Sequence, residues 1–265
     1  MLTNRQKLIL SKNSGTVGGS GDEMSFWEHL DVLRGTLFRS VLCIVFFSVI
    51  LLCFKGFLFD DVILAPTRPD FWLYSWLNLP FEMQLINTDI SAQFFIHLKV
   101  SFICGFVMSF PYVCYEVWMF VAPALYPAEK SAVRKAFSFA SVLFYAGLVI
   151  GYYLILPITL NFFQNYTVSS EITNTITLDS YISMFTSMVL LFGIVFEFPV
   201  LIAVLNRMGI VSRESLGKYR RYAVVAILII AAIITPADPF SMLIAAAPLY
   251  LLYELSILAC VRKSE

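Results

Sequence analysis

The sequence predicts an all-α membrane protein: six transmembrane helices in a kinked bundle, with short fifth and sixth helices. The first observation is composition, because 59% of the residues are hydrophobic and only 14% are charged, too few polar side chains to cover a water-soluble globule. The second is that the apolar residues fall into six stretches with few or no charges. The third is that Lys and Arg gather in alternate gaps between these stretches, as in a chain that crosses a bilayer repeatedly.

Each apolar stretch is expected to be a helix, because backbone groups in hydrocarbon must pair within their own segment. Residues 1–23 are polar and rich in Gly and Ser, so we expect a disordered cytoplasmic N-terminus without a secretory signal. Residues 24–262 form the transmembrane domain and residues 263–265 a C-terminal tail. The expected spans are about 36–59, 96–118, 136–163, 181–205, 222–235 and 240–260.

The fifth span is unusually short. Tyr222 to Thr235 is 14 residues, or about 21 Å of helix against a hydrocarbon core of about 30 Å. The sixth span is also short in charge-free length, since Pro239 precedes it and Glu254 lies near its inner end. Such a mismatch is relieved by bilayer thinning, by docking of a partner, or by burial behind the other helices.

Prolines and glycines suggest where the helices bend and pack. Pro111, Pro199 and Pro248 lie inside expected spans, and Pro157 is expected to close the third. Kinks at these positions favour a concave surface, although membrane helices also tolerate proline routinely. The spacing of Gly147 and Gly151 is typical of close helix contact, and we expect that contact to be intramolecular.

Charge asymmetry predicts the orientation. Of 18 Lys and Arg residues, 15 fall on the side of the amino terminus and only Lys55, Arg68 and Lys99 on the other, which places both termini in the cytoplasm. The basic loops are therefore topology signals, and no nucleic-acid partner is implied. All five cysteines lie in apolar stretches without metal-site spacing, so no metal or other cofactor is predicted.

Outside the spans, the largest gap runs from Asp60 to Gln93 on the outer side. It holds three prolines and several aromatic residues, a composition that favours a structured cap at the membrane interface.

Glu197 is a carboxylate between aromatic residues inside the fourth span, where an ionised group is costly. One interpretation is a neutral acid bonded to a backbone group freed by the kink at Pro199. The other is a polar point in a cavity that meets a guest helix or relays a proton.

On the cytoplasmic side, residues 120–129 read FVAPALYPAE, and the two prolines predict a rigid, aromatic-lined loop. Glu129 suits the first turn of the next helix, which Pro127 begins. Alternatively, Glu129 beside Phe120 and Tyr126 can receive a guanidinium group from a ligand.

With these elements in place, the chain resembles the TatC family, the multi-span receptor subunit of the twin-arginine protein translocase. The resemblance covers about residues 25–262. It is carried by SFWEHLDVLR at 25–34, FVAPALYPAE at 120–129, LFYAG at 143–147, FEFPV at 196–200 and TPAD at 235–238.

The resemblance implies a cup-shaped, six-helix protein of the bacterial cytoplasmic (inner) membrane that binds the twin-arginine signal peptides of folded cargo and performs no covalent chemistry. It also implies single-span partners of the TatA and TatB type, homo-oligomers within a receptor complex, membrane lipid as surroundings, and transport driven by the proton-motive force. Phe120 and Glu129 match the signal-binding loop of the family. Glu197 matches its buried fourth-helix glutamate and Asp238 its outer acidic turn.

One element departs from the family pattern. The family usually carries Glu two residues before the Arg of its amino-terminal motif, and here Val32 precedes Arg34 at that place. Two carboxylates can substitute in the signal site: Asp31, about 100° around the helix, or Glu28, one turn earlier on the face of Val32. The geometry of the helix favours Glu28. Alternatively, neither carboxylate takes part, and both lie on a solvated cytoplasmic face.

The sequence gives less support to two other functions. A proton-coupled secondary transporter of small solutes would use Glu197 with His97 and Lys99, but no repeated pair of broken helices is visible. An intramembrane enzyme is disfavoured, because the sequence contains neither a zinc-protease motif nor a nucleophile elbow.

Overall fold

The computed structural model describes residues 26–77, 81, 83–122, 127–169, 174–235 and 239–260, with the backbone alone for Phe26, Glu28, His29 and residues 127–133, 135, 136 and 259. The predicted N-terminal segment 1–23 and the tail 263–265 lie outside this part. The chain divides into two units, residues 1–35 and 36–265. Helix α2 begins in the first unit at Phe26 and ends in the second at Cys53.

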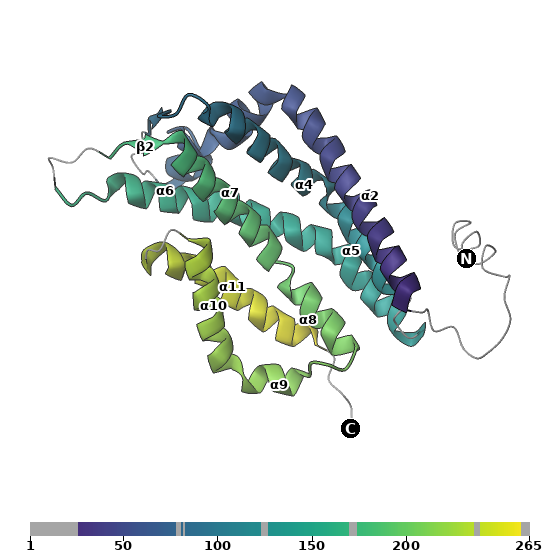
Figure 1. Ribbon diagram of the computed structural model, residues 1–265. Helices are drawn as coiled ribbons and strands as arrows, with labels where there is room; N and C mark the ends of the chain where they lie inside the picture. Colours follow the sequence, from purple (N-terminus) through teal and green to yellow (C-terminus); the bar gives the residue numbers. More distant parts are fainter. Residues whose placement is uncertain are drawn as a thin grey trace. The chain divides into compact units, whose positions relative to one another are not determined.

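The described chain is almost entirely helical, which confirms the predicted class (Figure 1). Its longer helices are α2 (Phe26–Cys53), α4 (Ala92–Val121), α5 (Pro127–Ile150), α6 (Leu156–Asn165), α7 (Leu178–Val195), α8 (Phe198–Arg207), α10 (Arg220–Ile234) and α11 (Pro239–Ala259). Short elements connect them: η1 (Phe57–Ile63), η2 (Ala65–Thr67), α3 (Trp72–Leu77), η4 (Gly151–Ile155) and α9 (Arg213–Lys218). Strands β1 (Leu85–Ile86) and β2 (Ile176–Thr177) pair in parallel, with Leu85 opposite Ile176.

Five helical segments within the described residues are long and apolar enough to cross a membrane: Leu30–Cys53, Ala92–Val121, Phe137–Asn165, Leu178–Arg207 and Pro239–Leu258. Helix α10 is the predicted short fifth helix, with 15 residues or about 22 Å. Helix α11 has 21 residues and continues past Glu254 to Ala259. The carboxylate of Glu254 accepts a hydrogen bond from Arg220 at 2.9 Å.

Helix α2 has a narrow inner face of small polar side chains. Thr36, Ser40 and Ser48 are buried, as is Leu51 at the outer end. The opposite face carries exposed apolar side chains, including Phe38, Leu42, Val45, Phe46 and Val49. Such a surface suits contact with lipid chains.

The best-packed helix pair is α5 with α7, which lie along each other in Figure 1. A Cβ atom on Gly147 would lie 2.6 Å from the carbonyl oxygen of Phe192, and one on Gly193 would lie 2.9 Å from the ring of Phe144. Glycine therefore allows the two backbones to approach this closely. The Phe144 ring stacks on Phe110 of α4 at 3.6 Å between centroids. The expected intramolecular role of the Gly147–Gly151 pair is confirmed.

The expectation that Pro157 closes the third span is wrong. The N–H of Leu156 bonds to the carbonyl of Gly151, five residues earlier, and the helix continues to Asn165. A π-helical turn absorbs the hydrogen bond that proline cannot make. Pro111 and Pro248 lie inside continuous helices, whereas the break between α7 and α8 falls at Phe196 and Glu197, just before Pro199.

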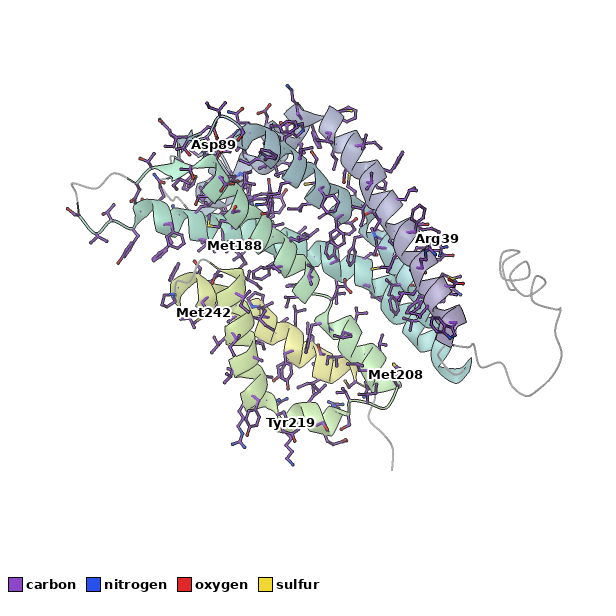
Figure 2. The ribbon with its side chains drawn as sticks, viewed as in Figure 1. Arg39, Asp89, Met188, Met208, Tyr219 and Met242 are labelled. Carbon is purple, nitrogen blue, oxygen red and sulfur yellow. The ribbon has the colours of Figure 1, made fainter. Side chains whose placement is uncertain are left out.

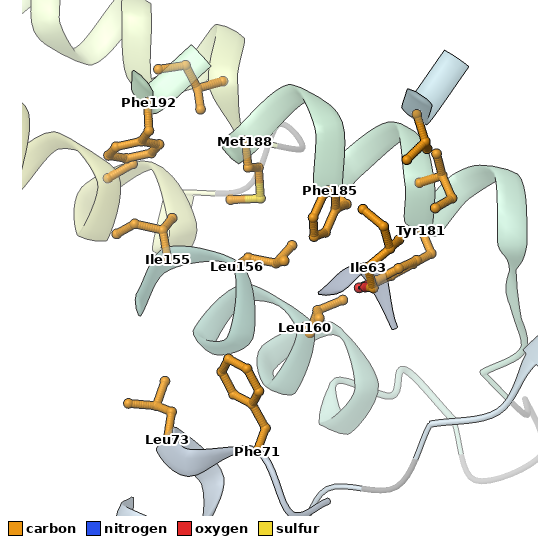
Figure 3. Close-up of a cluster of buried hydrophobic side chains, with 14 of the residues drawn as sticks. Ile63, Phe71, Leu73, Ile155, Leu156, Leu160, Tyr181, Phe185, Met188 and Phe192 are labelled. Carbon is orange, nitrogen blue, oxygen red and sulfur yellow. The ribbon is translucent and has the colours of Figure 1, made fainter. Parts of the chain in front are cut away.

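The outer cap comprises η1, η2 and α3, and hydrogen bonds from tyrosines hold its parts together and against the helices. Tyr152 donates to the carbonyl of Val62 at 2.8 Å, Tyr181 donates to Ile63, and Tyr74 donates to Pro66 at 2.9 Å. Figure 3 shows Tyr181 directed at Ile63 within the apolar cluster. Burial raises the pKa of Tyr74, so its phenol stays a hydrogen-bond donor. Each tyrosine satisfies a carbonyl that irregular backbone leaves unpaired.

Candidate functional site

The inner ends of α4 and α5 carry the predicted loop. Phe120 lies in the last turn of α4 and is half-buried. Helix α5 begins at Pro127, so Glu129 is its third residue, a place where a carboxylate complements the helix dipole. The side chain of Glu129 lies outside the described part, and so does all of Tyr126.

The amino-terminal candidates lie on the part of α2 that belongs to the first unit. Asp31 and Arg34 have exposed side chains, and Val32 is half-buried. Glu28 is one helical turn before Val32, but its side chain lies outside the described part. The choice between Glu28 and Asp31 therefore stays a prediction.

A charged cluster joins the middle of α2 to the carboxyl-terminal part of α4 (Figure 2 labels Arg39). The Nε of Arg39 donates to Glu116 Oε1 at 2.9 Å, and its second terminal nitrogen donates to Oε2 at 2.7 Å. Tyr112 adds a third donor, with its hydroxyl 2.7 Å from Oε1. The side chain of Glu116 is 7% exposed and that of Arg39 47% exposed. The carboxylate is thus removed from solvent and fully hydrogen-bonded.

Sequence reasoning missed Glu116. Both partners lie inside expected spans, Arg39 three residues after position 36 and Glu116 two residues before position 118. A signal was available, because opposite charges at similar depth in consecutive spans are expected to pair.

Glu197 lies at the break between α7 and α8. Its N–H bonds to the carbonyl of Ile194 at 3.1 Å, and its own carbonyl accepts from Leu201 at 3.0 Å. The side-chain oxygen Oε1 is buried and, within the described chain, has no hydrogen-bond partner. The carboxyl group also has a backbone hydrogen-bond partner at Phe144 of α5, so each of the two interpretations of Glu197 stays a prediction.

Glu197 follows the carboxyl-terminal end of α7, whereas Lys99 of α4 contacts the amino-terminal part of α7. Lys99 donates to Ser183 at 3.3 Å, and Ser183 precedes Glu197 by 14 residues, about 21 Å along a helix. His97 packs against Phe59 in the outer cap. These residues therefore do not form the compact proton relay that the transporter reading requires. Asp238, the remaining candidate, lies outside the described part.

Known proteins of one family match this chain over nearly its whole length. The family model of the Sec-independent protein translocase protein (TatC) matches residues 28–248. The TatC protein of Blattabacterium sp. subsp. Periplaneta americana is 34% identical over 251 residues, which covers 89% of this chain and 94% of the relative. The TatC protein of Escherichia coli K12 is also 34% identical, over 89% of this chain and 88% of the relative.

Solved structures agree with the sequence match. A crystal structure of the twin arginine translocase receptor TatC superposes with a TM-score of 0.72 at 32% identity, covering 88% of this chain and 97% of that chain. A second crystal structure of this receptor, in DDM, gives a TM-score of 0.74 at 31% identity. The match covers 88% of this chain and 100% of that chain. The chain therefore belongs to the TatC family, multi-pass membrane components of the Sec-independent protein translocase that are not enzymes.

Proposed function

We propose that this chain is the signal-peptide receptor and core subunit of a twin-arginine translocase in the bacterial cytoplasmic membrane. Both termini face the cytoplasm, and export of folded cargo draws on the proton-motive force. The observation that carries the proposal is the family match over residues 28–248, which includes the whole FVAPALYPAE loop. The partners are twin-arginine signal peptides, TatA- and TatB-type single-span subunits, and further copies of the chain.

The inner loop supplies the chemistry for one arginine. Glu129 can accept two parallel hydrogen bonds from a guanidinium group, while Phe120 and Tyr126 offer aromatic faces on which the planar group stacks. Each charge-assisted contact contributes about 1.5–3 kcal/mol in a partly desolvated site. Lysine keeps the charge but lacks the planar fork, so the site discriminates between the two.

The second arginine needs a second carboxylate. Val32 occupies the usual position of that carboxylate, and Glu28, one turn earlier, is the favoured substitute, with Asp31 as the alternative. Arg34, exposed on the same helix, completes this amino-terminal element.

Two further features serve the apolar part of the signal and the partner helices. The unpaired oxygen of Glu197 offers a hydrogen-bond acceptor to a helix that enters beside the α7–α8 break. The short α10 exposes Val225, Ile229 and Ile233, an apolar strip suited to a single-span subunit. Asp238 would act in the outer turn that follows α10.

Complementation tests the function. The gene is deleted from its host, and a folded reporter with a twin-arginine leader is followed to the far side of the membrane. We expect export to stop and to return when this chain is supplied. Export that persists without a second copy of the gene would refute the assignment.

Glu129 provides the residue-level test. Glu129→Gln keeps the shape of the side chain but removes the charge, so crosslinking of a twin-arginine peptide to the inner loop should fall about tenfold. Glu214→Gln is the matched control, because Glu214 is an exposed carboxylate near the start of α9. Equal crosslinking in both variants would remove Glu129 from the site.

A further inference from the structure

The Arg39–Glu116 cluster lies directly before the signal-binding loop. Tyr112, Glu116 and Phe120 follow one another at intervals of four residues on α4, so they share one face of the helix. Glu116 is one turn from Phe120 and Tyr112 one turn further away. Whatever fixes the rotation of Glu116 about the helix axis also fixes the direction of Phe120.

Helices α2 and α4 also approach closely at a second place. A Cβ atom on Gly105 would lie 2.7 Å from the backbone nitrogen of Ser48, so the helices nearly touch there. Arg39 pairs with Glu116 and Ser48 with Gly105, which means that the helices run antiparallel. Gly105 and Glu116 are 11 residues apart, about three turns, and lie on the same face of α4.

Helix α2 has little else to hold it. In its most apolar window only 17% of the residues are buried, against 39% for the third span. Two points define the register of a helix pair, but loss of either leaves α4 free to rotate or slide against α2. The inner point is the one that lies next to Phe120.

An ion pair is a costly way to join two helices in a membrane. Desolvating the Glu116 carboxylate offsets much of its attraction to Arg39, and apolar residues of similar volume often stabilise a protein as well as an ion pair does. A bidentate pair differs from an apolar contact because it has one geometry. The ion pair is therefore better explained as a device that fixes the orientation of α4 than as one that stabilises the fold.

We propose that Arg39 and Glu116 are positioning residues for signal-peptide recognition, which hold the last turn of α4 so that Phe120 faces the incoming peptide. This inference rests on the proposed receptor function. The pair does not contact the peptide. It acts through α4, and Tyr112 supports it by holding Glu116 in the rotamer that Arg39 requires.

The test uses the full-length chain in membranes, with a photo-reactive phenylalanine analogue at position 120. Crosslinking to a twin-arginine peptide is measured per molecule of membrane-inserted protein, and a twin-lysine peptide serves as the specificity control. Arg39→Gln and Glu116→Gln should each lower the yield about tenfold, because α4 can then rotate and Phe120 no longer faces the peptide. The charge swap Arg39→Glu with Glu116→Arg should recover most of it.

The chain contains a matched control. Arg220 donates to Glu254 at 2.9 Å, and Tyr250 donates to the same carboxylate at 3.0 Å. This second Arg–Glu–Tyr cluster joins α10 to α11, away from Phe120 in the sequence. Glu254→Gln removes an equivalent ion pair, and it should leave crosslinking at position 120 unchanged.

The possible outcomes distinguish a failure of the positioning role from a failure of the proposed receptor function. If the parent chain, with both ion pairs intact, fails to prefer the twin-arginine peptide, the receptor function fails. If the parent prefers it but Arg39→Gln and Glu116→Gln crosslink as well as the parent, the positioning role is overturned. A charge swap that inserts normally yet crosslinks as poorly as the single variants would also overturn it.

A milder variant covers the case in which the single variants fail to insert. Tyr112→Phe removes one hydrogen bond to Glu116 and leaves the ion pair in place. We expect a two- to threefold lower yield, about half a kcal/mol. An unchanged yield would contradict the inference.

Discussion

Two helix pairs in this molecule are joined by different means. The carboxyl-terminal part of α5 and the following η4 interlock with α7, where Gly147, Gly151 and Gly193 admit the rings and backbone of the facing helix. Helices α2 and α4 approach each other at a small-residue contact and are joined by an ion pair. The first arrangement tolerates no change in spacing, whereas the second permits α2 to move if the polar contact is lost.

The difference separates scaffold from receptor. Tyr152 of η4, which continues α5, and Tyr181 of α7 hold the outer cap, so this pair behaves as the fixed part of the molecule. The α2–α4 pair ends beside Phe120, where a peptide must be recognised. A contact made by charged hydrogen bonds fixes orientation without the close packing that would bury the site.

The largest effect is expected at the α5–α7 contact. Gly147→Ala places a methyl group where the Phe192 carbonyl and the Phe196 ring already lie within 2.8 Å, so the backbones must separate. We expect a loss of about 3 kcal/mol or more in unfolding free energy, measured by thermal unfolding in detergent. Gly217→Ala is the control, because nothing lies within 4 Å of a Cβ there. Equal melting temperatures would contradict the account of this interface.

Gly105→Ala repeats the substitution at the α2–α4 contact. The clash is similar, with Ser48 backbone atoms at 2.7 and 2.9 Å, but α2 is sparsely packed and can shift. The unfolding free energy should therefore fall by only about 1–2 kcal/mol. If Gly105→Ala destabilises the protein as much as Gly147→Ala, the two interfaces are equally rigid and the contrast drawn between them fails.

The outer cap should respond through its tyrosines. Tyr181→Phe leaves the buried carbonyl of Ile63 without its donor, at a cost of about 1–3 kcal/mol. Thermal unfolding of the purified variant measures the loss, and Tyr115→Phe, at an exposed position of α4, is the comparison. Equal melting temperatures for the two variants would show that the cap does not need this hydrogen bond.

Neutralising the ion pair should change orientation more than stability. Glu116→Gln is expected to cost about 1–2 kcal/mol, less than for a fully buried pair, because Arg39 remains partly solvated. The double variant Arg39→Gln with Glu116→Gln should cost less than the sum of the single variants. Strict additivity in thermal unfolding would mean that the two side chains are not coupled.

Much of the fold was predictable because apolar length and backbone pairing leave a membrane chain few choices. The five long spans and the short α10 follow from those two constraints. The course of the chain at Pro157 did not, since a proline can either end a helix or be accommodated by a π-helical turn, and the structure has the second arrangement. The sequence also did not reveal the ion pair between Glu254 and Arg220. Glu254 was noticed only as a limit on the charge-free length of the sixth span.

The candidate site was predictable to a smaller extent. Phe120, Glu129 and Glu197 stand out because polar or aromatic residues at a loop or in hydrocarbon require a reason. Arg39 was read only as a topology charge, and Glu116 was overlooked beside an apolar stretch. Pairing between distant spans is a property of the folded bundle, and periodicity within one helix does not reveal it.

The central claim is that this chain recognises paired guanidinium groups. The most direct measurement is the affinity of the purified protein, in detergent and with TatA- and TatB-type subunits supplied, for a twin-arginine leader and for the same leader with two lysines. We expect the arginine leader to bind at least about tenfold more tightly, because only arginine offers the planar fork. Equal affinities for the two leaders would contradict the account.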